Sequence, residues 1–312
     1  MDIDTVTIGL LLASAVRLGA PVLLASLGEL VSERAGVLNI GLEGIMLFAA
    51  FGAVLGLQWT DLPVAGMAIG AGFGVLAAAV LSITVALLRA DQVVVGIGFN
   101  MLALGATSLM RELLLNSAFT VPSLKIISSY KIPYLADIPI IGRAFFSQSP
   151  VLYGGIVIAV LLWALLKYSR IGLILRSVGE GAEAADAAGI SVTAVRFMAI
   201  LFTGLLAGIG GSYLTLVASG GMFVDNITGG RGYLTVAIVI FGRWHPIYVM
   251  FASILLGCAD ALQYQGQAIG ISIAPPLLLM SPFLLALVAW VLMGKSKSAP
   301  SDIGIPFLRG QK

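Results

Sequence analysis

The chain has 312 residues, of which 59% are hydrophobic and only 10% are charged, and its mean hydropathy is +1.06. Soluble domains contain about 45–50% apolar and about 25% charged residues. The composition therefore excludes a soluble protein and indicates a polytopic membrane protein. The net charge of +2 is too small to favour nucleic acid as a partner, and the single cysteine, Cys258, excludes an internal disulfide.

The apolar runs predict an all-α protein with about eight to ten transmembrane helices, some of them broken or re-entrant. Nine candidate spans follow in chain order: 6–27, 37–57, 63–88, 92–114, 150–167, 194–217, 232–242, 246–263 and 277–293. The seventh is too short to cross a bilayer alone, because a span needs about 20 residues. Residues 1–294 thus form one transmembrane domain. The polar tail, 295–312, is expected to be a short mobile extension.

The placement of Lys and Arg favours an N-terminus outside the cell. In that orientation 11 basic residues lie inside: Arg34, Arg89, Lys167, Arg170, Arg176, Arg196, Arg243, Lys295, Lys297, Arg309 and Lys312. Five lie outside: Arg111, Lys125, Lys131, Arg143 and Arg231. This asymmetry agrees with the positive-inside rule. It places the proline-rich loop 115–149 outside and the charged loop 168–193 in the cytoplasm.

The cytoplasmic loop predicts a short capped helix over 178–188. Ser177 is the expected N-cap, with Glu180 as its capping-box partner. Alanines supply helix propensity, and Gly189 is the expected C-terminal stop. The segment is too polar to enter the bilayer and too small to fold alone. It is either a solvated connector or, given its face of small side chains, a docking helix for a cytoplasmic partner.

A polar, glycine-rich stretch interrupts the apolar pattern at 28–48. Asn39 and Glu43 are four residues apart and so share one face of a helix. A charge at the bilayer centre costs about 2.5–3.5 kcal/mol on insertion scales. Glu43 must therefore lie near an interface, be protonated, be paired, or face a wet cavity. It serves either as a buried carboxyl bonded to another helix or as part of a transport pathway, and we expect a broken or kinked helix near 36–44.

A second stretch of this kind lies at 225–235. Both stretches contain Asn-Ile, then clustered glycines, then an apolar run that ends in Phe-Gly. Paired, glycine-interrupted segments in two halves of a chain point to a transport site. The candidate pathway residues are Asn39, Glu43, Phe48, Asn100 and Arg231. The plainer alternative for each is a hydrogen bond or contact between helices.

The search for catalytic residues finds none. The only histidine is His245, so a His/Cys metal cluster is excluded. Gly294-Lys295-Ser296 resembles the end of a phosphate loop, but Ala289 stands where the first glycine is required. We therefore expect no enzyme activity, no bound metal and no cofactor in this chain.

Several segments resemble the ABC transporter permeases of the ribose/branched-chain amino acid superfamily, and most closely its nucleoside or simple-sugar branch. The segment from Glu33 to Gly44 resembles the family signature. The segment from Leu175 to Ile190 resembles its coupling loop, and the segments 229–233 and 240–246 resemble two later landmarks. Glu183-Ala184-Ala185 with Gly189 meets the older importer pattern, but its continuation is absent because Ala199 stands at the isoleucine position.

The resemblance implies an ATP-driven importer in the bacterial cytoplasmic membrane, with nucleosides or simple sugars as substrates. Its partners would be an ABC ATPase that carries ATP and Mg, a second permease subunit that is a paralogue, and an outer substrate-binding protein. The residues that would contact the ATPase are Arg176, Glu180, Glu183, Ala184, Ala185 and Gly189.

Two other classes remain open. A secondary transporter driven by an ion gradient would explain the broken helices and Glu43 without a docking loop. A lipid-processing membrane enzyme would need a catalytic constellation, which the sequence lacks. Substrate identity does not follow from these residues alone.

Overall fold

The computed structural model describes residues 5–115, 127–136, 138, 141–265, 277–278, 280–293 and 299–308. Its elements are, in chain order, α1 Thr5–Arg34, α2 Leu42–Thr60, α3 Pro63–Ser82, η1 Ile83–Leu87, α4 Gln92–Leu114, β1 Tyr130–Lys131, α5 Ile141–Phe145, β2 Ser147–Gln148, α6 Pro150–Tyr168, α7 Arg170–Glu180, α8 Ala182–Ala187, α9 Val192–Tyr213, η2 Leu214–Ala218, α10 Arg231–Phe241, α11 Pro246–Gln265 and α13 Ser281–Met293. The two short strands pair antiparallel. This confirms the predicted all-α fold of a multi-pass membrane protein.

Each of the nine predicted spans contains a helix, but the second, 37–57, begins with non-helical residues, because α2 starts only at Leu42. Among the described residues, seven helices are long and apolar enough to cross a membrane: α1, α2, α3 with η1, α4, α6, α9 with η2, and α11. Helix α10 has 11 residues and α13 has 13, so neither can cross alone. The sequence predicted that the seventh span, which is α10, is short. Contacts between its N-terminus and Glu43 of α2 hold it in the bundle.

Local sequence fixes several helix starts. Proline occupies the first turn of α3 and α6, where its missing N–H costs nothing. Asp91, Ser169 and Ser191 cap α4, α7 and α9, since each side chain accepts a hydrogen bond from a backbone N–H of the first turn.

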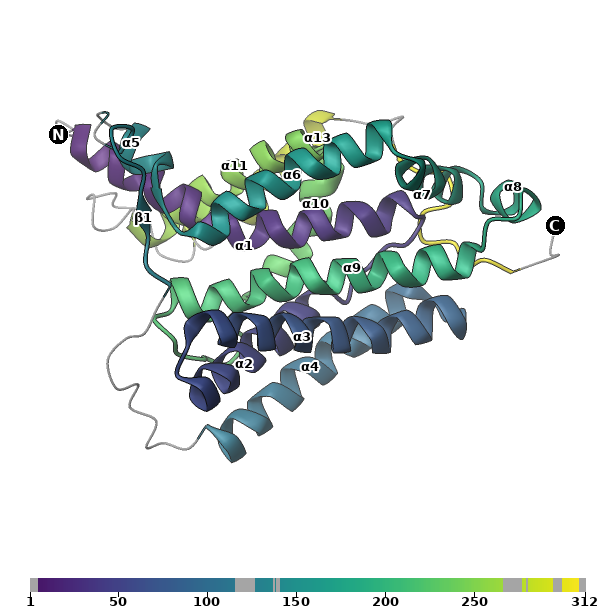
Figure 1. Ribbon diagram of the computed structural model, residues 1–312, viewed down its shortest axis with the longest axis horizontal. Coiled ribbons are helices and arrows are strands. Elements are labelled where there is room, and N and C mark those ends of the chain that lie inside the picture. Colours follow the sequence, from purple (N-terminus) through teal and green to yellow (C-terminus); the bar gives the residue numbers. More distant parts are fainter. Residues whose placement is uncertain are drawn as a thin grey trace.

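Helices α1 and α9 run through the middle of the bundle (Figure 1). Helices α2, α3 and α4 lie on the α9 side, and α6, α11 and α13 lie on the α1 side. One core cluster packs α1 against α6, α9, α10 and α11, and a second packs α1 and α9 against α2 and α3. The described C-terminal segment, 299–308, lies beside α7 and α8 at one end of the bundle, and α5 lies at the other (Figure 1).

Helices α3 and α9 approach closely because glycines form their contact. A Cβ added to Gly74 of α3 would lie 2.6 Å from the backbone oxygen of Gly204 and 2.6 Å from the Cα of Gly208. Without a strong hydrophobic drive between helices in lipid, such close backbone contact supplies the packing energy. Glycines in this chain thus allow the backbones of α3 and α9 to approach closely.

The predicted helix at 178–188 is wrong in its bounds. Helix α7 begins at Arg170, where Ser169 caps it, and Ser177 lies inside it and donates to the Ile174 carbonyl. Helix α7 ends at Gly181, and α8 follows as a separate helix. The helix starts early because its apolar residues Ile174, Leu175 and Val178 give it a face that packs on the bundle. Gly189 does end the segment, with φ +85°.

The predicted mobile tail is also wrong for residues 299–308, which pack on the loop of α7 and α8. The Asp302 carboxylate accepts a hydrogen bond from Ala182 N at 2.6 Å, and Asp302 N donates to the Gly179 carbonyl. Gly304 N donates to the Gly36 carbonyl. Arg196 donates from Nη1 to the Ile305 carbonyl at 2.7 Å. The tail therefore joins α8 to the turn that follows α1.

We predict that Gly74→Leu destabilises the purified protein by about 1–3 kcal/mol, because overpacking forces α3 away from α9. Thermal unfolding in detergent would measure the loss. Gly72→Leu is the matched control, since a Cβ at Gly72 meets nothing within 4 Å on the same helix. Equal melting temperatures for the two variants would contradict the close-packing account.

Candidate functional site

The chain between α1 and α2 is a non-helical break within the bundle, as predicted for this region. Gly36 adopts φ +81°, a conformation that glycine tolerates without strain. The buried Glu29 carboxylate accepts a hydrogen bond from Asn39 N at 2.9 Å, and the Gln92 side-chain oxygen accepts one from Leu38 N at 2.8 Å. Backbone groups that a helix would satisfy internally are thus satisfied by side chains, as the membrane interior requires.

Asn100 of α4 completes the same break. Its Oδ1 accepts from Gly44 N at 2.8 Å, and its Nδ2 donates to the Ile40 carbonyl at 2.9 Å and to the Tyr233 hydroxyl at 2.9 Å. The amide both donates and accepts, so a single side chain bonds the backbone at the start of α2 and also reaches α10. The polar atoms of Asn100 are occupied within the protein.

Glu43 lies in the first turn of α2 and meets the N-terminus of α10. Its Oε1 accepts from the Thr228 hydroxyl at 2.5 Å and from Gly230 N at 2.8 Å, and its Oε2 accepts from Gly232 N at 2.6 Å. The first N–H groups of a helix lack partners within it and carry partial positive charge. The carboxylate supplies both the missing acceptors and a compensating charge. The two glycine-rich stretches that resemble one another in sequence therefore bind each other.

Asn39 is buried, and its side chain differs from that of Asn100 in one respect. Its Nδ2 has no hydrogen-bond partner within the described part of the chain. An unpaired buried donor costs about 1–3 kcal/mol. Of the two predicted amides, only Asn39 has a buried donor without a partner in the described part of the chain.

Phe48 is half-buried on α2, and its ring lies 5.9 Å from that of Phe99 on α4. The two rings are tilted by 46°. Phe48 lies five residues, or about 1.4 turns, beyond Glu43 along α2. The predicted pathway residues 39, 43 and 48 thus follow one another along the break and the helix that leaves it.

The side chain of Arg231 borders a cavity that neither Asn39 nor Asn100 lines. Its Nη2 lies 3.1 Å from the Asp260 carboxylate of α11, and both side chains are nearly buried. It borders a cavity of about 490 Å³ among α1, η2 and the 224–227 segment, which is also lined by Ser14, Arg17, Asn226 and Gln265. Glu43 bonds the backbone on either side of Arg231, so the N-terminus of α10 separates the α2 break from this cavity.

Arg17, Asn226 and Gln265 line this cavity but were not predicted as site residues from the sequence. A signal for the first was available, because Arg17 is a charge inside an apolar span. The ties between α1 and the turn after α10 were not predicted either. There Trp244 Nε1 donates to Glu33 at 2.5 Å, and Arg34 donates to the Trp244 carbonyl at 2.9 Å.

The predicted coupling residues divide into an exposed set and a packed set. Glu180, Glu183, Ala184 and Gly189 are exposed, and Arg176 is half-buried with Nε bonded to the Gly172 carbonyl. Ala185 is buried in a small cluster formed with Val178, Ala182 and Val192. The α7–α8 end thus exposes acidic and small residues, and the buried cluster around Ala185 packs beneath them.

No group of three or more His, Cys, Asp or Glu side chains that could hold a metal ion occurs among the residues described. His245 precedes α11 and lies against Tyr248, with ring centroids 4.5 Å apart. Partial burial and the nearby charges of Arg34 and Lys167 hold the pKa of His245 below its usual value. It is therefore neutral at physiological pH.

Comparison with known proteins gives full-length relatives. The chain is 36% identical to the guanosine ABC transporter permease protein NupQ of Bacillus subtilis, with 100% of both chains covered. It is 33% identical to the nucleoside ABC transporter permease protein NupC of Lactococcus lactis, with 98% of both covered. A putative glucose ABC transporter permease protein, TsgC13 of Haloferax volcanii, is 34% identical over 85% of this chain and 80% of its own. No solved structure matches.

The relatives include paralogous permeases. Bacillus subtilis has a second guanosine permease protein, NupP, which is 27% identical over 78% of this chain and 70% of its own length. The family model described as branched-chain amino acid transport system / permease component matches residues 11–296. These matches make the chain a transport permease subunit rather than an enzyme. The chain belongs to the branched-chain amino acid transport system permease component family.

Proposed function

We propose that this chain is one permease subunit of an ATP-driven importer that moves nucleosides across the bacterial cytoplasmic membrane. The observation that carries the proposal is the match to NupQ and NupC, the one named for guanosine and the other for nucleosides, over almost the whole of each chain. Simple sugars are the second candidate substrates, supported by the match to TsgC13.

The α7–α8 end lies in the cytoplasm and contacts the ATPase. The excess of basic residues in the predicted inner loops supports this orientation. Exposed Glu180, Glu183, Ala184 and Gly189 form the contact surface, and the ATPase supplies ATP and Mg, so this chain needs no cofactor. Through Asp302 and Gly304, movement of α8 is passed to the turn at Gly36 and so to the α2 break.

The other partners lie in and outside the membrane. The second permease is a paralogue, as the pair NupQ and NupP suggests, so the pathway is formed by a heterodimer. An outer binding protein delivers the substrate to the end of the bundle opposite α7 and α8. Membrane lipid surrounds the exposed apolar faces, and no nucleic acid is bound.

The substrate passes Asn39, and the cavity beside Arg231 is a polar space on the outer side of the same junction. Nucleosides offer hydroxyl and base groups that an amide and a guanidinium can bond. The half-buried ring of Phe48 offers the substrate an aromatic face. Glu43 and Asn100 keep the junction in shape rather than bind substrate, because their polar atoms already bond backbone.

Uptake of radiolabelled guanosine by the assembled transporter should stop when ATP is depleted and the ion gradients are held. A secondary transporter would continue under those conditions, and that result would overturn the proposal. The same cells given a sugar in place of guanosine would separate the two substrate classes.

Glu183→Trp should abolish uptake while ATP hydrolysis continues, because the added ring separates α8 from the ATPase. Glu112→Trp is the control, since Glu112 is also exposed but lies near the far end of α4. Membrane levels of both variants should equal those of the wild type.

Asn39→Ala should lower the uptake rate or alter the preference among nucleosides without lowering thermal stability. Asn100→Ala should differ, because it removes three hydrogen bonds and leaves Gly44 N without its acceptor. We expect it to lower stability by about 1–3 kcal/mol. Unchanged transport of every nucleoside by Asn39→Ala would show that Asn39 is structural.

A further inference from the structure

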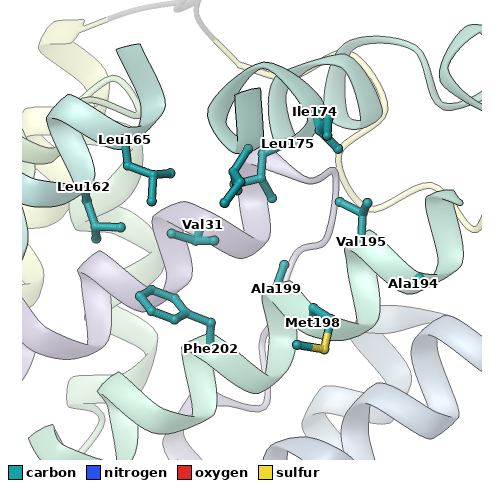
Figure 2. Close-up of a pocket in the computed structure, with 11 residues that line it drawn as sticks. Val31, Leu162, Leu165, Ile174, Leu175, Ala194, Val195, Met198, Ala199 and Phe202 are labelled. Atoms are coloured by element: carbon teal, nitrogen blue, oxygen red, sulfur yellow. The ribbon is translucent and has the colours of Figure 1, made fainter. Parts of the chain in front are cut away.

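An apolar groove lies among the ends of α1, α6 and α9 that are nearest to α7. It has a volume of about 430 Å³, within the range of ligand sites. Figure 2 shows Leu162 and Leu165 of α6 on one side, Met198 and Phe202 of α9 on the other, and Val31 of α1 between them. All eleven lining residues are aliphatic, Met or Phe.

Helix α7 closes the groove at that end. Ile171, Ile174 and Leu175 belong to the lining, so one face of the first two turns of α7 borders the groove. Met198 is 63% exposed and Ile171 is 59% exposed. An open groove lined only by apolar side chains gives water no partners, so in the membrane it is filled by an apolar group.

The end of α6 marks the level of the lipid head groups beside this groove. Lys167 Nζ lies 5.3 Å from the centre of the Trp163 ring and 5.1 Å from that of the Tyr168 ring. Trp, Tyr and Lys gather at membrane–water interfaces in this way. Arg170 follows at the start of α7 and is exposed. Two cations thus lie at the helix corner between Leu165 and Ile171, which both line the groove.

We propose that the groove binds one acyl chain of an anionic phospholipid, with the phosphate at Lys167 and Arg170. The apolar lining selects a hydrocarbon chain, and the two cations select an anionic head group. That the lipid belongs to the cytoplasmic leaflet rests on the orientation in the proposed function. The occupancy of the groove does not depend on it.

The two cations at the end of the groove favour a phospholipid over a helix of the second permease as its occupant. A hydrocarbon chain is thinner and can extend from α7 to Phe202. Because the lipid contacts both α7 and α9, its binding holds α7 against the bundle and so acts on the helix that carries the coupling surface.

The test uses the full chain in nanodiscs that contain phosphatidylglycerol with a photoreactive diazirine in its acyl chain. After irradiation, mass spectrometry should find label concentrated on α9 peptides with Met198 and Phe202. Ala194→Trp should remove most of this label, because Ala194 is exposed and lines the groove. Ala68→Trp, at an exposed alanine of α3, should leave it unchanged.

Competition with unlabelled lipid tests the head group. Lys167→Gln and Arg170→Gln should each lower the preference for phosphatidylglycerol over phosphatidylethanolamine about fivefold, which corresponds to ~1 kcal/mol per basic residue near an anionic surface. Equal labelling of all lipid-facing helices would overturn the site. In nanodiscs that also hold the second permease, an oxidant-induced disulfide between Met198→Cys and a cysteine introduced into the second permease, with no lipid label, would also overturn it. The labelling experiment does not depend on transport. A failed uptake experiment would therefore count against the proposed function but not against the lipid site.

Discussion

The carboxylate of Glu43 joins the two interrupted parts of this bundle. Helix α2 starts after the break that follows α1, and α10 starts after the glycines at 229 and 230. A single side chain accepts three hydrogen bonds from the chain at the start of α10. A helix N-terminus inside a membrane protein needs both acceptors and negative charge. Without Glu43, the short helix α10 would begin on unsatisfied backbone.

Other polar groups support the same junction. Asn100 bonds the start of α2 and reaches Tyr233 on α10, and Glu29 bonds the backbone at Asn39. These contacts let irregular backbone exist inside the bundle. They also fix the backbone at Asn39, whose side-chain Nδ2 has no partner in the described part of the chain. The tail and α8 are joined to the turn at Gly36, which leads into this junction.

The sequence alone predicted part of this arrangement. The four-residue spacing of Asn39 and Glu43 and the glycines around them predicted a broken helix, and the similarity of the 28–52 and 225–242 stretches indicated paired segments. Sequence could not show that the two stretches bind each other, since no periodicity encodes a contact across 185 or more residues. The alternative of a buried carboxyl bonded to another helix describes Glu43 best.

The coupling segment shows the opposite case. Ser177 and Glu180 have the spacing of a capping box, yet α7 starts eight residues before the predicted helix. Its apolar face packs on the bundle, and this tertiary packing overrides a local cap signal. The docking of the tail depends on backbone bonds such as Gly304 N to the Gly36 carbonyl. Such bonds carry no residue-type pattern, so composition suggested a free tail.

Amide hydrogen exchange at the start of α10 tests the central role of Glu43 most directly. In Glu43→Gln one acceptor oxygen becomes an NH₂ group, so at least one of the amides at Gly230 and Gly232 loses its acceptor. Exchange in a peptide that covers 226–234 should then become about tenfold faster or more, since a lost buried bond costs about 1–3 kcal/mol. A peptide from the middle of α6, which makes no hydrogen bond to this junction among the described residues, should be unchanged. Equal exchange at 226–234 in the variant and the wild type would contradict the claim that this carboxylate holds α10.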